Sequence, residues 1–166
     1  MKLPARFTRL MLNGFPPLFF NRIAITYLSA DYQQMEVLVR KSLFNKNLQG
    51  TIFGGTIFSA ADPYHAILYW QLMAHRGLAT EAWLKSAEID YHRPGHTHLR
   101  LRFAVTEAEV HEAERALKTE GRFQKWHEVQ ALDAQGQPCA TIRTLVYLRL
   151  RNLQQVKTPE PAQAIP

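Results

Sequence analysis

The sequence contains one cysteine and no long apolar run, and each shortage excludes a class of structure. With Cys139 alone, the chain can form neither an internal disulfide nor a cysteine-based metal cluster, so a reducing compartment such as the cytoplasm is the simpler expectation. The longest apolar run near the start, residues 15–20, is far shorter than the roughly 20 residues that a membrane-spanning helix needs. We therefore expect a cytoplasmic protein with no stable membrane insertion.

The composition fits one globular domain. The chain has 166 residues, of which 46% are hydrophobic and 20% charged, enough to bury a core. Its formal charge of +6 favours an anionic partner, such as nucleic acid, a membrane surface or a phosphate-bearing small molecule, or serves only solubility. Nucleic-acid binding is not favoured, because the sequence has no helix-turn-helix or base-stacking motif.

The two ends of the chain differ from its middle. Residues 1–21 form an N-terminal helical segment, in which Phe7, Leu10 and Met11 make an apolar stripe that we expect to pack on the domain. The basic residues among them also resemble a membrane-surface helix, so contact with a membrane stays open. We expect a single domain over residues 1–151 and a disordered tail over 152–166, which has few apolar residues to pack.

Alternating apolar residues predict six strands arranged as three antiparallel hairpins. The hairpins pair residues 22–28 with 35–39, 84–92 with 99–105, and 124–132 with 138–150. Between the last two hairpins, Thr106 and Glu109 form a capping box that opens a helix ending near Gly121. The fold class is therefore α+β, with an antiparallel six-stranded sheet.

One long apolar stretch organises the rest of the chain. From residue 47 to 75 the apolar residues follow helical spacing on most faces, which predicts a long buried central helix ending at Gly77. Between Lys46 and Arg76 the only formally charged side chain is Asp62. One sheet must wrap this helix and leaves its own edges open, so we expect pairing with a second copy.

The start of this helix can do chemistry. If it begins at Gly54 and Gly55, its free N–H groups can bind an oxyanion, and Asp62, two turns further on, can orient or deprotonate a water. The structural alternative is that Asp62 and Pro63 only cap the point where a kinked helix restarts.

These residues carry a family resemblance. Phe53-Gly54-Gly55, followed by Phe58 and Asp62-Pro63 and preceded by Asn47, resembles the signature of hotdog-fold acyl-CoA thioesterases of the phenylacetate-pathway type. The similarity extends over roughly residues 22–151. It looks closest to an uncharacterised branch, a domain of unknown function, that shares the Phe-Gly-Gly and Asp-Pro motifs.

The resemblance implies a hotdog fold, a homodimer or homotetramer, and hydrolysis of acyl-CoA or a related acyl thioester, with coenzyme A as part of the substrate and no other cofactor. It implies that Asp62 activates the water, that the Gly55 N–H polarises the carbonyl, and that Asn47 positions the reacting atoms. The expected substrate-binding residues, some of them from spacing alone, are Phe53, Gly54, Phe58, His65 and Arg93. The acyl chain and the choice between dimer and tetramer stay open.

The departure from the family pattern is at Phe53, where the family has a histidine. Phenylalanine cannot hydrogen-bond a carbonyl or hold a water, which motivates an alternative, a non-catalytic binder of acyl-CoA or fatty acyl ligands. A dehydratase is disfavoured for the same reason. His92, His96 and His98 surround a turn without further ligands at matched spacing, so we expect no metal site.

Overall fold

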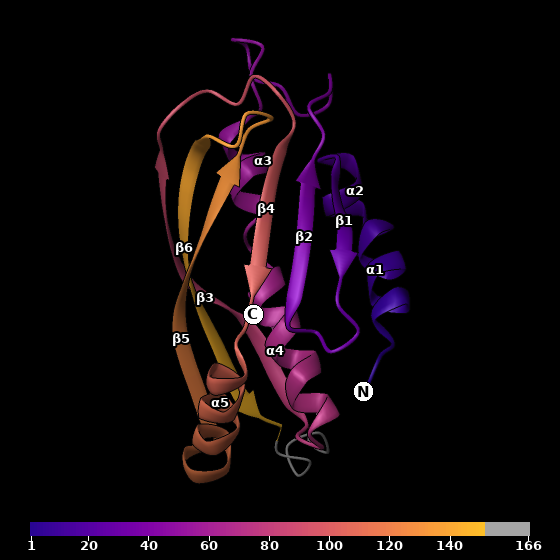
Figure 1. The fold of residues 1–166 in the computed structure, drawn as a ribbon, viewed down its shortest axis with the longest axis vertical. Helices are drawn as coiled ribbons and strands as arrows, with labels where there is room; N and C mark the ends of the chain where they lie inside the picture. The colour runs from indigo at the N-terminus through magenta and orange to yellow at the C-terminus, as the bar shows by residue number, and fades with distance from the viewer. Residues whose placement is uncertain (152–166) are drawn as a thin grey trace, which may run out of the picture.

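The computed structural model describes residues 1–151 of the chain, so the predicted tail lies outside the described residues. A curved sheet lies over two consecutive helices, α3 and α4, while α1 and α2 lie beside one edge of the sheet (Figure 1). In chain order the elements are α1 (Ala5–Asn13), α2 (Pro16–Phe20), β1 (Ile23–Leu28), β2 (Gln34–Val39), α3 (Gly54–Ser59), α4 (Tyr64–His75), β3 (Thr80–Tyr91), β4 (Leu99–Ala104), α5 (Glu107–Glu120), β5 (Arg122–Leu132) and β6 (Pro138–Leu150).

The sheet has six antiparallel strands in the order β1-β2-β4-β5-β6-β3. The hairpins β1–β2 and β5–β6 are confirmed, but the predicted pairing of β3 with β4 is wrong. β3 pairs along its whole length with β6, from Thr80 opposite Leu150 to Tyr91 opposite Ala140, and β4 lies between β2 and β5. The Pro94-Gly95 turn therefore joins strands that are not neighbours, because β5 and β6 lie between β4 and β3 in the sheet.

The central helical segment is divided in two. α3 ends at Ser59, and the amides of Ala61 and Asp62 both donate to the carbonyl of Phe58 in a tight turn before α4 begins at Tyr64. Pro63 has no N–H to continue the ladder, which explains why the single long helix that the sequence suggests is interrupted here. The turn brings Asp62 to the surface of the chain, not into its interior.

The core lies between the sheet and α4. Nine of the 12 residues of α4 are buried, and they pack against inward-facing side chains of the strands such as Val37, Leu101 and Ile142. Alternation along β4, buried at Leu99, Leu101 and Phe103 and exposed between them, shows a sheet with one dry face. Among residues 1–151, no helix is long and apolar enough to cross a bilayer.

The two outer helices are attached differently. α5 begins with the predicted capping box of Thr106 and Glu109 and buries Val110, Ala113 and Leu117. α1 begins without a side-chain cap and buries only Thr8. The stripe of Phe7, Leu10 and Met11, predicted to pack on the domain, is exposed, because α1 turns Ala5, Thr8 and Leu12 inward instead.

Candidate active site

A hollow of about 560 Å³ opens at the start of α3. Its walls come from the loop before α3, from the first residues of that helix, and from the end of β3 with the turn that follows. The lining residues are Asn47, Thr51, Ile52, Phe53, Gly54, Gly55, Ile57, Tyr91, His92, Arg93, Pro94 and Gly95. Five of the predicted site residues therefore share one hollow: Asn47, Phe53, Gly54, Gly55 and Arg93.

The backbone at the start of α3 offers unused donors. Phe53 is extended at the N-cap, and the amides of Thr56 and Ile57 donate to its carbonyl. The amides of Gly54 and Gly55 have no hydrogen-bond acceptor within residues 1–151. As the first two amides of a helix, they are free to bind an oxygen that carries negative charge.

Two aromatic side chains fix this turn. The Tyr91 hydroxyl donates to the carbonyl oxygen of Gly54 at 2.9 Å. The ring of Phe53 covers Gly55 so closely that a Cβ at residue 55 would lie 2.4 Å from Phe53 Cε1. Only glycine fits at residue 55 while the ring keeps this position. Phe53 is itself 56% exposed, so its ring forms an apolar lip on the hollow.

Two further predicted residues line the hollow with their polar groups already engaged. Asn47 donates from Nδ2 to Thr51 Oγ1, and its Oδ1 accepts from the amides of Gln49 and Thr51, which closes the loop before α3. The Arg93 guanidinium lies 3.4 Å from the Pro138 carbonyl oxygen and 4.0 Å from the Asp133 carboxylate, and its side chain is partly exposed. Asn47 thus stabilises the loop before α3, and the Arg93 guanidinium stays partly exposed to solvent.

Asp62 lies in a different hollow, of about 260 Å³, between α4 and β3. Its other lining residues are apolar: Pro63, Ala66, Ile67, Trp70, Ala82, Trp83 and Leu84. Within residues 1–151 the carboxylate has neither a hydrogen bond nor an ion pair, and it makes no cap bond to α4. Desolvation raises the pKa of the Asp62 carboxyl above its ordinary value. The alternative capping role is therefore not seen. Within residues 1–151 the Asp62 carboxylate is without a partner and lies beside apolar side chains.

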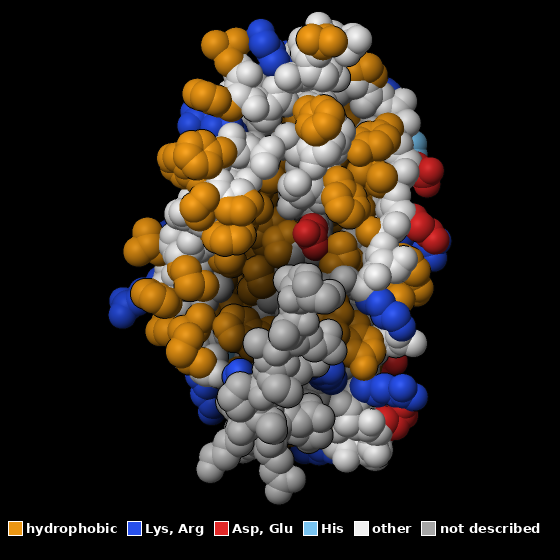
Figure 2. All heavy atoms as spheres, turned by 180° about the vertical axis from the view of Figure 1, so that it is seen from behind, with side chains coloured by type: hydrophobic (Ala, Val, Ile, Leu, Met, Phe, Trp, Pro, Cys, Tyr) orange, Lys and Arg blue, Asp and Glu red, His pale blue; other side chains and the backbone are white. Residues whose placement is uncertain are grey.

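This side of the molecule is broadly hydrophobic. Figure 2 shows apolar side chains over much of it, with an acidic group near the middle. The outer edge of β3, which carries Trp83 and Tyr91, has no strand partner within residues 1–151. A long unpaired edge strand beside an apolar face is a surface on which another chain can pair.

His65, which was expected to bind substrate, lines neither hollow. Its imidazole is buried, stacked on His127 with ring centroids 4.3 Å apart, and it meets Phe103 edge-on. Desolvation, with His127 adding to it, lowers the pKa of His65 to about 3. His65 therefore faces the sheet as a neutral core residue. Phe58, also predicted to contact substrate, is half-buried and lines neither hollow.

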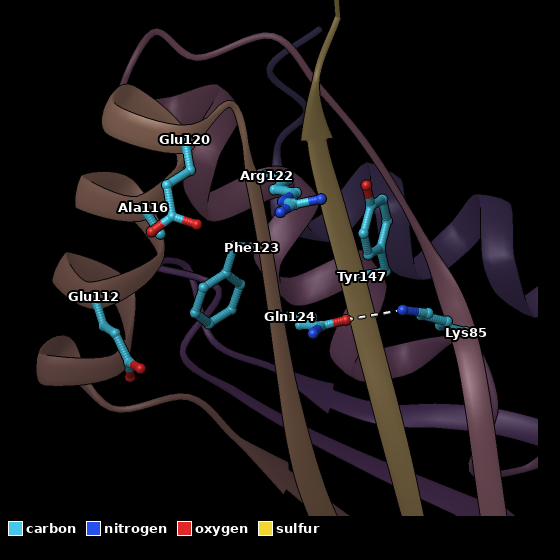
Figure 3. A pocket seen from close by; sticks show the side chains of 8 residues that line it. All are labelled: Lys85, Glu112, Ala116, Glu120, Arg122, Phe123, Gln124 and Tyr147. Atoms are coloured by element: carbon cyan, nitrogen blue, oxygen red, sulfur yellow. Dashed lines mark hydrogen bonds between the residues drawn. The ribbon is translucent and has the colours of Figure 1, made fainter.

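A third hollow, of about 390 Å³, lies between α5 and strands β5, β6 and β3 (Figure 3). Glu112 and Glu120 of α5 and Arg122 and Lys85 of the strands give it charges of both signs, and Lys85 donates to Gln124 at 3.0 Å. It holds none of the predicted site residues. Its charges of both signs make it a less suitable place for acyl chemistry.

Tyr91 was not among the predicted site residues. The contact between Tyr91 and Gly54 joins residues 37 positions apart, and no local sequence pattern predicts it. The separation of Asp62 and the Gly54–Gly55 turn into different hollows of one chain was also not predicted. Pro63, eight residues after the second glycine, was the available signal, because it breaks the helix that would have linked them.

Comparison with protein families finds a match to the family model described as a domain of unknown function, DUF4442, over residues 4–148. No curated protein matches the sequence.

Solved structures with the same arrangement are numerous and distant in sequence. A protein of unknown function from Pseudomonas aeruginosa, described as a probable thioesterase, is 18% identical with a TM-score of 0.81, covering 91% of this chain and 99% of that one. The PaaI protein of the Escherichia coli phenylacetic acid degradation operon is 19% identical with a TM-score of 0.61, covering 89% and 93%. A thioesterase from Haemophilus influenzae is 10% identical with a TM-score of 0.67, covering 90% and 93%. These likenesses establish the hotdog fold that the resemblance implied.

Proposed function

Because the chain belongs to the DUF4442 family and has the fold of thioesterase-like proteins, we propose that it hydrolyses acyl-CoA or a related acyl thioester. The observation that carries the proposal is the pair of unused amides at Gly54 and Gly55, which open into a hollow large enough for a thioester group. Acyl-CoA is a cytoplasmic substrate, and we propose that compartment for the reaction.

The chemistry needs one base and one oxyanion site. Asp62 takes a proton from water, and the water oxygen attacks the thioester carbonyl carbon. The carbonyl oxygen becomes an oxyanion held by the Gly55 N–H. The carbon–sulfur bond then breaks as protonated Asp62 returns its proton to the leaving sulfur, which releases the carboxylic acid and the coenzyme A thiol. A raised pKa suits Asp62 to this task, because it makes the carboxylate a stronger base than an ordinary aspartate.

The two halves of this site are brought together by a second copy of the chain. β3 touches both hollows: its start, at Ala82, Trp83 and Leu84, lines the hollow of Asp62, and its end, at Tyr91, contacts Gly54. If two copies pair antiparallel along their free β3 edges, the start of one strand lies opposite the end of the other. Asp62 of one copy then faces the Gly54–Gly55 turn of its partner, and the dimer carries two equivalent sites.

Turnover of purified protein tests the reaction directly. The readout is release of free thiol from acyl-CoA substrates of increasing chain length, compared for the unmodified chain and for Asp62→Asn. We expect Asp62→Asn to lose about a hundredfold or more in turnover, because general-base catalysis typically contributes that much. Glu120→Gln, which removes a carboxylate from α5, is the matched control and should leave turnover unchanged. Equal turnover in Asp62→Asn and the control would contradict the proposed role.

Mixing two inactive variants tests the shared site. A mixed dimer of Asp62→Asn and Gly55→Ala has one site with both changes and one with neither. Random re-pairing should therefore restore about a quarter of the original activity, since half of the dimers are mixed and each has one intact site. No recovery, in a preparation shown to exchange subunits, would place the whole site within one chain.

The alternative is a non-catalytic binder of acyl-CoA or fatty acyl ligands, favoured by the apolar Phe53 lip at the hollow. Titration calorimetry distinguishes the two functions. Tight binding of acyl-CoA without thiol release supports the binder, whereas the absence of both binding and turnover rejects the two proposals together.

A further inference from the structure

The N-terminal helices expose a ridge of large apolar side chains. We define the N-terminal ridge as Phe7, Leu10 and Met11 of α1 with Phe15, Phe19 and Phe20 at α2, all of them exposed, Leu10 by 72% and Phe20 by 66%. The opposite side of α1 anchors it to the domain, where Thr8 Oγ1 and the Tyr32 hydroxyl are 2.6 Å apart. The ridge is therefore left outside by a helix that is fixed in place.

Cations surround the ridge without counterions. The first 30 residues contain Lys2, Arg6, Arg9 and Arg22 and no aspartate or glutamate. None of these four side chains has an ion-pair partner among residues 1–151, whereas Arg76, Arg143 and other arginines elsewhere are paired with glutamates. The positive charge beside the ridge is thus available to an external anion.

A hollow of about 430 Å³ lies next to the ridge and gathers part of this charge. Arg9, Arg22 and Arg40 line it together with Phe19 of the ridge and the backbone of β1, and no acidic residue lines it. Arg22 also lies over the ring of Phe44, at 6.0 Å, which adds the exposed loop residues Leu43 and Phe44 to the same side. An anionic group can enter this hollow while apolar chains meet the ridge.

The ridge is at the opposite edge of the sheet from the free strand. α1 and α2 contact β1, the first strand of the sheet order, and β3 is the last (Figure 1). The N-terminal ridge is therefore not part of the β3 edge along which we propose that a second copy pairs. Its occupant must match exposed aromatic and aliphatic side chains together with several unpaired cations.

We propose that the N-terminal ridge docks the protein on an anionic lipid surface. Helices with large apolar side chains on one side and Lys or Arg beside them lie in the plane of the interface, with the apolar side in the acyl region and the cations on lipid phosphates. α1 has nine residues, too few to span, so it lies on the surface. The hollow of Arg9, Arg22 and Arg40 takes a lipid headgroup phosphate, and the docking does not depend on thioester hydrolysis.

Vesicle sedimentation of the full chain tests the proposal, with vesicles of phosphatidylcholine alone or mixed with phosphatidylglycerol. We expect sedimentation with the anionic vesicles that decreases with salt, and little with phosphatidylcholine alone. Arg22→Gln with Arg40→Gln should weaken it by about fivefold for each arginine, and the corresponding lysine variants should retain it. Leu10→Ser with Phe20→Ser should weaken it by about tenfold. The matched control is Arg115→Gln, at an exposed arginine of α5 that has no ion-pair partner among residues 1–151.

Three outcomes would overturn the proposal. The first is no sedimentation with anionic vesicles by a chain that is folded by circular dichroism. The second is equal sedimentation of the ridge, arginine and control variants. The third is a Leu10→Ser and Phe20→Ser variant that changes the oligomeric state without changing vesicle binding, which would make the ridge an interface between copies.

Discussion

α3 and α4 come from one continuous apolar stretch of sequence, yet α4 is largely buried and α3 begins at an open hollow. α4 buries Tyr64, His65, Leu68 and most of its other residues under the sheet. α3 buries Thr56 and Ile57 but begins at two half-buried glycines with unused amides and an open hollow. The contrast indicates that α4 contributes most to stability, while the proposed function places the chemistry at the start of α3 and the turn after it. Substitutions in the two helices should therefore separate folding from turnover.

The largest expected effect is on stability, from Leu68→Ala in α4. Leu68 is fully buried, so its truncation should lower the free energy of unfolding by about 2–5 kcal/mol. Urea denaturation measures this loss, and turnover per folded molecule should stay near that of the unmodified chain. Leu48→Ala, at a fully exposed loop residue, is the matched control and should change stability little. A similar loss in both variants would show that burial in α4 does not make a larger contribution to the free energy of unfolding than an exposed loop residue does.

Acid should lower the folding stability that the packing of α4 provides. His65 has its pKa lowered to about 3 in the folded chain, against 6.5 for an ordinary histidine, so the unfolded chain binds the extra proton. The contribution of His65 to the free energy of unfolding is fully present above about pH 6.5 and is lost as the pH falls toward 3. The loss between pH 7 and pH 5 is about 2 kcal/mol.

Urea unfolding of the unmodified chain and of His65→Phe at several pH values measures this slope. The variant should lose much of the pH dependence and keep the part that arises from His127, whose pKa burial also lowers. Equal slopes in the two proteins would show that His65 is not the responsive group.

At the start of α3, Gly55→Ala should reduce turnover by about ten- to a hundredfold while changing the free energy of unfolding by no more than about 1 kcal/mol. The new Cβ displaces the Phe53 ring and disturbs the oxyanion donor, but the ring has room at the surface. Adding Phe53→Ala should recover part of the turnover.

Gly14→Ala provides the matched control for this substitution. A Cβ at residue 14 meets only ordinary contacts, the nearest being the Leu10 carbonyl oxygen at 3.6 Å, so turnover should not change. A Gly55→Ala protein that unfolds as readily as Leu68→Ala would erase the distinction between the two helices.

The smallest expected effect is that of Tyr91→Phe, which removes one hydrogen bond to the Gly54 carbonyl. A net contribution of about 0.5–1.5 kcal/mol corresponds to a two- to tenfold decrease in turnover, with substrate binding less affected. Tyr27→Phe, at an exposed tyrosine of β1, is the control. An unchanged rate constant would mean that the Phe53 ring and the loop hold the glycine turn without Tyr91.

Local features of the fold were predictable because local physics sets them. The capping box at Thr106 and Glu109, the start of α3 at Gly54 and the hairpin of β5 with β6 each depend on residues close together in the chain. The pairing of β3 with β4 was predicted wrongly, because Pro94-Gly95 signals a turn but not which strands become neighbours. The exposure of Phe7, Leu10 and Met11 was also missed, since periodicity reports a stripe and not what covers it.

In the candidate site, too, local features were predictable and contacts between distant residues were not. The sequence by itself determined where the central helix begins and where it breaks, because glycine and proline constrain the backbone within a few residues of themselves. Only the tertiary structure decided that Tyr91 holds Gly54, that His65 faces His127, and that Asp62 lies by the start of β3, the last strand of the sheet. Those contacts join distant residues, and their partners are selected by how the whole chain buries its apolar surface.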